Sequence, residues 1–341
     1  MGLTRSDTIL KYIVEYFIKN AQPVGSHTLI EEYNLPYSSA TIRNEMFALE
    51  KMGYIEKTHS SSGRVPSSKG YKYYCEHLRD KSIDEALKNS LQVVLEQKVQ
   101  SIEEVIKASC EILSHMTNLV SVVTGGGEEV ERLASVQLIQ ISENTLTAVF
   151  VTDKGYVENK TFIMPSTIKA NEVVECVKLL NDRLIGTPVN ELVPKMEALK
   201  PVLSDYVVSH DLVYQALLET FIRFAGDRLS LYGRDELFNQ PEFKNDAEKL
   251  QEVLRLLNDK AVFKEVKNKG EDVVLDIGES NPDVSMVSTT VKIGNGENTI
   301  TLLGPTRMDY DKVLSALEYI TEELNKYFDD LNKKGGDGGD A

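Results

Sequence analysis

Three short helical patterns follow one another in the first 53 residues and constrain the fold more than any other feature of the sequence. The first begins after a cap at Thr4 or Ser6 and ends before QPVG, because proline cannot continue a helix and glycine permits the turn. The second, HTLIEEY, is capped by Ser26. The third, ATIRNEMFALEKM, is capped by Ser38 or Ser39 and is closed by a glycine.

The third pattern has two different faces. The stripe to be buried consists of Ile42, Met46, Leu49 and Met52. The outward face of its first turns carries Thr41, Arg43 and Asn44, with Ser39 as a further candidate. A short strand (YIEK), the loop THSSSGR and a second apolar segment follow. Three helices followed by a strand, a loop and a strand predict a winged helix-turn-helix domain over residues 1–80, with Arg64 at the tip of the wing.

In such a domain the third helix lies in the major groove, where arginine can pair with guanine and asparagine with adenine, while hydroxyl groups hold phosphates. The wing suits phosphate or minor-groove contact. The same triple of helices also occurs in proteins that bind no DNA, so an interaction module stays open. The candidate DNA-binding residues are Ser38, Ser39, Thr41, Arg43, Asn44, His59, Arg64, Lys69, Tyr71 and Lys72.

Charge is distributed unevenly along the chain. The net charge is −15, but residues 1–80 carry ten Lys/Arg against nine Asp/Glu, and residues 81–341 carry 28 against 44. Within residues 57–79 five basic side chains accompany one acidic side chain. This asymmetry is typical of a DNA-reading head on an acidic body.

The rest of the chain alternates between helical and strand patterns. A helical pattern over residues 84–123 suits either a connector to a partner helix or a helix packed on its own sheet, and three antiparallel strands follow it. Mostly helical patterns then fill residues 166–265, before further strands and a closing helix. This order predicts an α+β fold, in which an α/β sandwich domain (84–165 and 266–331) is interrupted by an inserted helical domain (166–265). The glycine-rich end, 332–341, should be disordered.

Several classes of function find no support. No apolar run is long enough to span a membrane, and Cys75, Cys110 and Cys176 lie far apart, which favours a reduced, cytoplasmic protein. The histidines form no pair at metal-ligand spacing, and the chain has no catalytic Ser/His/Asp order and no nucleotide fingerprint. We therefore expect no enzyme activity, no metal and no cofactor.

The GPTRMDY segment admits two interpretations. Arg307 and Asp309 could belong to a small-molecule site. Alternatively, the segment ends a strand and starts the closing helix, and Arg307 pairs with Asp309 in the first turn; this structural interpretation is the stronger one.

Several blocks resemble the family of heat-inducible transcription repressors named HrcA. They are QPVGSHTL, SSATIRNEMFALEKMGYIEKTHSSSGRVPSSKGYKYY, VQLIQISENTLTAVFVTDKGYVENK, IGESN and LLGPTRMDYDKV, and the similarity runs from about residue 5 to about residue 328. One departure lies in the wing, where HSSSGR replaces the family's usual HTSAGR and keeps the hydroxyl character.

The resemblance implies a GAF-like sandwich whose insert supplies dimerisation. It also implies binding to double-stranded DNA at an inverted-repeat operator, the CIRCE element, upstream of chaperone operons, and activity maintained by the GroEL chaperonin. A homodimer is expected on physical grounds too, because one winged helix covers half of an inverted repeat. A regulator gated by a small molecule in the GAF-like domain remains an alternative.

Overall fold

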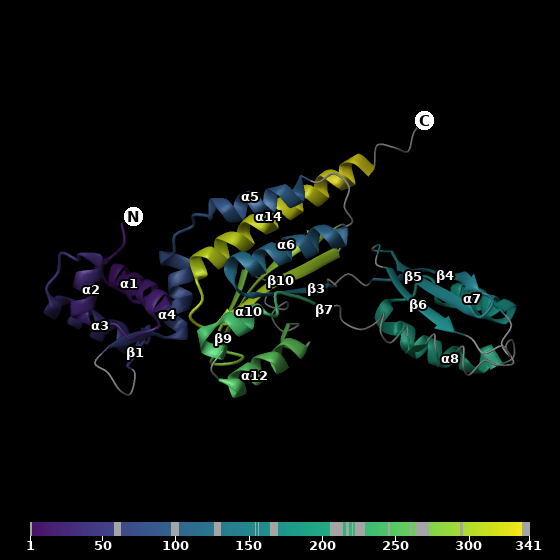
Figure 1. Cartoon of the computed structure of the whole chain (residues 1–341), viewed down its shortest axis with the longest axis horizontal. Coiled ribbons are helices and arrows are strands. Elements are labelled where there is room, and N and C mark those ends of the chain that lie inside the picture. Colours follow the sequence, from purple (N-terminus) through teal and green to yellow (C-terminus); the bar gives the residue numbers. More distant parts are fainter. Residues whose placement is uncertain are drawn as a thin grey trace. The chain divides into compact units, whose positions relative to one another are not determined.

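The computed structural model of the chain consists of helices and antiparallel sheets (Figure 1). The residues that it describes are 2–57, 63–96, 102–125, 131–153, 155, 157–163, 170–204, 214–215, 218–219, 221, 229–244, 246–259, 261–263, 273–293 and 296–335.

The chain divides into two compact units. Unit 1 comprises Met1–Thr124, Leu229–Ile293 and Asn298–Ala341, and unit 2 comprises Gly125–Arg228 and Gly294–Glu297. Within unit 1 we call residues 2–78 the head and the remainder the body.

The elements of the head follow the predicted order of three helices and two strands, after which come two helical segments that were not predicted. In chain order the elements are α1 (Arg5–Asn20), α2 (Ser26–Tyr33), α3 (Ser39–Lys51), β1 (Ile55–Lys57), β2 (Arg64–Pro66), α4 (Ser68–Tyr73) and the π-helical turn η1 (Tyr74–Leu78). β1 and β2 form an antiparallel hairpin, and β2 is extended by a bridge between Arg64 and Val24. Three helices with a small hairpin make the predicted winged-helix arrangement.

Side-chain caps decide where three of these helices begin, and for α4 the cap is Ser67, whose hydroxyl accepts from the backbone N–H of Gly70. Thr4 and Asp7 form a capping box at the start of α1, and the Ser38 hydroxyl accepts from the backbone N–H of Thr41 at the start of α3. The prediction that Ser26 caps α2 is wrong, since the N-cap is Gly25 and makes no side-chain bond. A hydroxyl inside the first turn can bond to a neighbouring helix instead, as Ser26 does.

A five-stranded sheet forms the centre of the body, in the order β7-β3-β10-β9-β8. The strands are β3 (Val120–Gly125), β7 (Leu229–Tyr232), β8 (Val273–Ile277), β9 (Val284–Ile293) and β10 (Gly296–Pro305). The registers of β3 with β7 and of β8 with β9 are antiparallel.

Helices cover both faces of this sheet (Figure 1). The helices on one face are α5 (Glu85–Leu95), α6 (Ile102–Thr117) and α14 (Tyr310–Gly335), and those on the other are α10 (Glu236–Asn239), α11 (Pro241–Lys244) and α12 (Ala247–Asn258). Successive residues of a strand point to opposite faces of the sheet. Leu302 of β10 therefore packs in the core with α5, α6 and α14, and Leu303 packs in the core with α10, α11 and α12.

The predicted helical run over 84–123 is therefore two helices and a strand. α5 and α6 pack on each other and on α14 of the same chain, which agrees with a helix packed on its own domain. Val120, expected on the helical seam, lies in β3. α14 continues to Gly335, so the first part of the tail predicted to be disordered is helical, and residues 336–341 lie outside the described residues.

Unit 2 has a sheet of its own, made of β4 (Leu133–Ser142), β5 (Thr145–Thr152) and β6 (Val157–Ile163). One face of that sheet packs on α7 (Ala170–Leu184) and α8 (Leu192–Ser204). The interrupting segment thus begins near residue 125 and ends near 228, instead of spanning 166–265. Strand patterns do not state which sheet a strand joins, and so the three strands were expected in the sandwich.

Candidate nucleic-acid interface

The outward face of α3 is the exposed surface of the head that carries both predicted base-reading side chains. Arg43 and Asn44 are exposed, while Ile42, Met46 and Leu49 are buried in the core of the head. The predicted burial of Met52 is wrong, because this residue caps the carboxyl end of α3 and is 47% exposed. Helical periodicity places these two sets on opposite sides of α3. The arrangement presents an arginine fork and an amide side by side to whatever approaches the helix.

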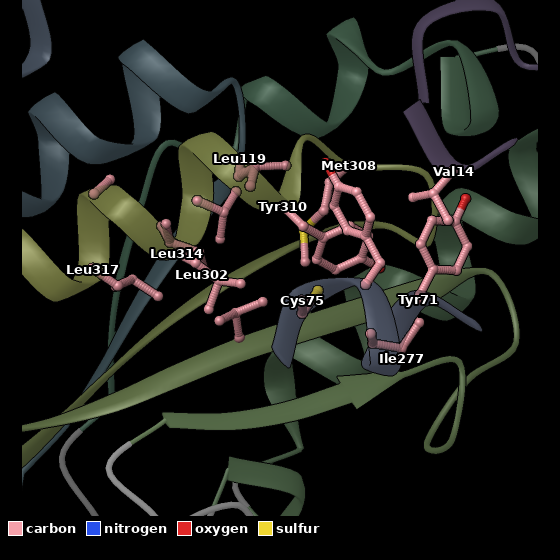
Figure 2. Packing of buried hydrophobic residues seen from close by; sticks show 14 of the residues in the cluster. Val14, Tyr71, Cys75, Leu119, Ile277, Leu302, Met308, Tyr310, Leu314 and Leu317 are labelled. Atoms are coloured by element: carbon pink, nitrogen blue, oxygen red, sulfur yellow. The ribbon is translucent and has the colours of Figure 1, made fainter. Parts of the chain in front are cut away.

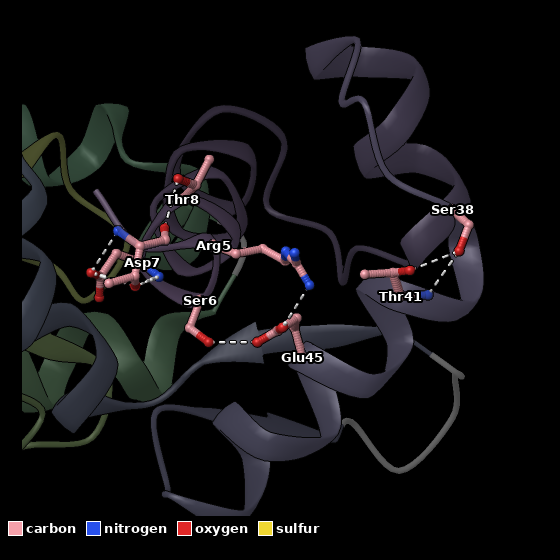
Figure 3. Close-up of polar contacts among 8 residues, drawn as sticks. Arg5, Ser6, Asp7, Thr8, Ser38, Thr41 and Glu45 are labelled. Carbon is pink, nitrogen blue, oxygen red and sulfur yellow. Dashed lines mark hydrogen bonds and ion pairs between the residues drawn. The ribbon is translucent and has the colours of Figure 1, made fainter. Parts of the chain in front are cut away.

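Hydroxyl groups organise the start of α3. The Ser38 Oγ lies 2.8 Å from the Thr41 Oγ1 (Figure 3), and the Ser39 Oγ lies 2.8 Å from the Ser26 Oγ. The Arg43 Nε donates to the same Ser26 Oγ at 3.2 Å. Ser26 therefore links α2 to α3 and orients Arg43, which reduces the conformational entropy that the arginine would lose on binding.

Glu45 fixes the rotation of α3 on α1. Its carboxylate accepts from the Ser6 hydroxyl at 2.5 Å and lies 3.6 Å from the Arg5 guanidinium, as Figure 3 shows. The Arg5 guanidinium also lies over the Tyr37 ring, 5.1 Å from its centroid. With Glu45 held on this side, the face that carries Arg43 and Asn44 is kept outward.

The hairpin corrects one expectation. Arg64 pairs with Lys57 in the last pair of the hairpin before the loop, so it lies where the wing begins and not at the tip of the wing. Its Nε and NH2 donate to Glu50 at 2.9 and 2.7 Å, and its side chain is 12% exposed. Arg64 thus ties the hairpin to α3. His59, the other candidate in the wing, lies outside the described residues.

Tyr71 is buried against the body, whereas Lys72 is half-buried at its edge. The Tyr71 ring is 1% exposed and packs against Tyr310 with ring centroids 5.2 Å apart (Figure 2), and burial raises its pKa. Lys72 forms an ion pair with Glu279. A DNA contact by Tyr71 is therefore excluded by burial, and one by Lys72 would require breaking its ion pair. The expectation for Tyr71 is wrong, because α4 packs against β8 and the ring is covered by the body. The expectation for Lys72 stays a prediction.

Lys69 is exposed, unlike Tyr71 and Lys72, the other two candidates in this segment. Its Nζ donates to the carbonyl of Met52 at 2.9 Å and lies 4.6 Å from the Tyr54 ring centroid. These contacts hold the ammonium group beside the carboxyl end of α3.

Lys69 and Lys72 should differ in their effect on binding to DNA. Lys69→Ala is expected to weaken all duplexes alike and to lower the slope of log affinity against log salt by about one, because one phosphate contact is lost. The matched variant Lys72→Ala should leave the slope unchanged. Fluorescence anisotropy over a salt series measures both slopes. Equal slopes in the two variants would remove Lys69 from the phosphate-contacting set.

The head is joined to the body by polar contacts as well as by a shared core. The Tyr74 hydroxyl donates to Asp311 at 2.8 Å, and Arg79, whose side chain is 4% exposed, pairs with Glu318. Burial raises the pKa of the Asp311 carboxyl, and the hydrogen bond from Tyr74 opposes that shift. The head is thus held in a defined orientation on the body.

Arg307 belongs to this joint and not to the first turn of α14. Its Nε donates to Glu242 at 2.7 Å, and its NH1 donates to the carbonyl of Ile18 at the end of α1. The predicted pairing of Arg307 with Asp309 is therefore wrong. Asp309 instead caps α14, accepting from the backbone N–H of Lys312 at 3.1 Å.

One residue of the α3 face was missed by the sequence analysis. Phe47 is 67% exposed and lies one turn beyond Arg43 and Asn44. The spacing of four from Arg43 and three from Asn44 was the available signal, since such positions share a helix face. An apolar residue on a short helix usually belongs to the core, so its residue type alone does not indicate that Phe47 is exposed.

The described residues bear on two other classes of site. They contain no group of three His, Cys, Asp or Glu side chains placed to hold a metal ion. None of the helices among them is long and apolar enough to cross a membrane.

Comparison with known proteins supplies the family. A family model described as the HrcA protein C-terminal domain matches residues 103–314. The heat-inducible transcription repressor HrcA of Halalkalibacterium halodurans is 35% identical over 332 residues, which cover 95% of this chain and 96% of that relative. A crystal structure described only as that of a hypothetical protein has a TM-score of 0.63 at 25% identity and covers 96% of this chain and 99% of its own.

The family model covers more than half of the chain, and the curated relative matches both the head and the body. The chain therefore belongs to the HrcA family of heat-inducible transcription repressors, which are DNA-binding regulators and not enzymes.

Proposed function

We propose that the protein represses transcription by reading a specific DNA sequence with the outward face of α3. The observation that carries the proposal is the exposure of Arg43 and Asn44 together on a helix whose rotation is fixed by Glu45. An arginine can pair bidentately with guanine and an asparagine with adenine, which are the commonest specific contacts in the major groove.

Phosphate contacts would surround this face. Ser38, Ser39 and Thr41 offer hydroxyls at the amino end of α3, where the helix dipole favours phosphate. Lys69 offers a cation beside the hairpin, and His59 with the rest of the wing would extend the contact along the duplex. The acidic remainder of the chain would repel DNA at long range and keep non-specific affinity low. The proposed location is the cytoplasm, since the proposed partner is DNA.

We propose that the sandwich of the body is GAF-like and that unit 2 supplies the surface through which the protein dimerises. The strand registers define one face of the unit 2 sheet that points away from α7 and α8. The residues on this face carry no charge. They are Ser135, Gln137, Ile139, Thr145, Thr147, Val149, Val151, Val157, Asn159, Thr161 and Ile163. Ile163 is 84% exposed and Ile139 47%. Exposed apolar area depleted of charge is typical of the centre of a protein interface.

A charge in the middle of this face should prevent dimerisation. Val149 lies between Gln137 and Asn159 in the register, so Val149→Lys would bury a lysine without a partner in the dimer. We expect sedimentation equilibrium to give a monomer and the affinity for an inverted repeat to fall at least tenfold. Glu175→Lys, on an exposed part of α7, is the control and should remain dimeric. A dimeric Val149→Lys protein would place the interface elsewhere.

The operator is proposed to be an inverted repeat of the CIRCE type upstream of chaperone operons, and GroEL is proposed to maintain the active repressor. The test is a titration of the purified protein with a CIRCE-type duplex and a scrambled duplex, with and without GroEL. GroEL should raise the fraction that binds the operator, and an unfolded competitor protein should reverse the gain. Operator preference that GroEL leaves unchanged would favour the regulator gated by a small molecule.

A further inference from the structure

The exposure of Phe47 needs an explanation, because a phenylalanine on a short helix is normally turned into the core. Its side chain is 67% exposed, more than Leu3 (48%) or Met52 (47%), the other large apolar residues recorded as exposed in the described part of the head. Its neighbours along α3, Met46 and Leu49, are buried. The outward position of Phe47 therefore follows from helical periodicity and is not a fault in the packing.

The rotation of α3 cannot turn this ring inward. Glu45, two residues before Phe47, is bonded to Ser6 of α1, and Glu50, three residues after it, is bonded to Arg64 of β2. Two anchors on different sides of the helix hold its face in place. Any duplex that meets Arg43 and Asn44 will also meet Phe47, one helical turn further along the same face.

The chemistry of the ring defines what it could recognise in the groove. Phenylalanine has no donor or acceptor, so it cannot pair with the polar edge of a base. The 5-methyl group of thymine is the apolar feature of the major groove, and contact with phenylalanine is one of the ways in which it is read. Burial of the ring against a methyl group removes apolar area of both from water.

We propose that Phe47 is a specificity-determining residue that reads a thymine 5-methyl group in each operator half-site, beside the base pairs read by Arg43 and Asn44. The inference rests on the proposed function. It adds a thymine to the half-site at a position that polar contacts alone would leave unread.

The test removes one methyl group at a time. Each thymine of a CIRCE-type half-site is replaced in turn by deoxyuridine, which keeps base pairing and the O4 acceptor. Full-length wild type and Phe47→Ala are titrated at one fixed salt concentration. At one position the replacement should weaken wild-type binding about threefold to tenfold, the effect of one buried methyl group, and should leave Phe47→Ala unchanged. Phe47 is exposed, so the variant should fold normally.

Controls separate the outcomes. Phe238→Ala removes a ring that is 52% exposed on α10 of the body and should behave as wild type with every duplex. Equal sensitivity of wild type and Phe47→Ala to deoxyuridine at every position would overturn the inference. An equal loss of affinity for operator and scrambled DNA in Phe47→Ala would also overturn it, because such a loss indicates contact with the sugar. A change in the response to GroEL alone would overturn it as well, because it indicates a protein contact. Lack of operator preference in wild type would instead refute the proposed function itself.

Discussion

Gly70→Ala is expected to destabilise the head strongly, because the helix α4 approaches the backbone of the turn after α3 too closely for any side chain. An added Cβ at residue 70 would overlap the carbonyl oxygen of Tyr54 and lie 3.0 Å from its carbonyl carbon. That carbonyl accepts from the backbone N–H of Ser67 at 3.0 Å, and the N–H of Tyr54 is itself bonded to Leu49. Backbone held at both ends cannot move aside.

The expected cost is about 3 kcal/mol or more of the free energy of unfolding, at the upper end for an overpacked site. Thermal unfolding followed by circular dichroism gives the change, and operator binding should fall as the folded fraction falls. The matched control is Gly25→Ala, since an added Cβ at residue 25 meets nothing within 4 Å. If Gly70→Ala proved as stable as Gly25→Ala, the packing of α4 on Tyr54 described above would be incorrect.

Arg43→Ala is expected to cost about 1–3 kcal/mol of binding free energy at the operator, roughly 5- to 150-fold in affinity, and to flatten discrimination between sequences. Ser26, which accepts from Arg43, keeps its bond to Ser39, so the fold should not change. Binding isotherms on operator and scrambled duplexes at one salt concentration give the ratio of affinities. Wild-type discrimination in the variant would remove Arg43 from the base-reading set.

Arg43→Lys distinguishes base reading from simple charge. Lysine keeps the positive charge but not the planar fork that pairs with guanine through two parallel bonds. We expect the variant to regain much of its affinity for scrambled DNA while operator preference stays low. Full recovery of the preference by lysine would mean that Arg43 contributes only a phosphate contact.

Local features of the head could be predicted from the sequence, because they depend on near neighbours in the chain. Periodicity and caps located α1 and α3, and turn chemistry located the hairpin that Lys57 and Arg64 form. The alternation of apolar residues located β4, β5 and β6 of unit 2 and β8, β9 and β10 of the body, but not β3, which lies in the predicted helical run. The exposure of Arg43 and Asn44 also follows from the helical pattern alone.

Features that depend on distant contacts could not be predicted. Tyr71 looks like an exposed member of a basic segment until Tyr310, far along the chain, covers it. Arg64 looks like a free arginine until Glu50 binds it. Likewise, the strands of unit 2 carry the same alternation as those of the body, and only their pairing assigns them to a separate sheet. Sequence patterns state which face is apolar, but not which partner covers it.

The central claim is that the face of α3 reads DNA sequence, and one titration tests it most directly. Purified full-length protein is titrated with a CIRCE-type inverted repeat and a scrambled duplex of the same length and composition over a salt series. A preference for the inverted repeat that persists as salt rises, and that Arg43→Ala abolishes, is the predicted result. Equal affinity for both duplexes at every salt concentration would contradict the account.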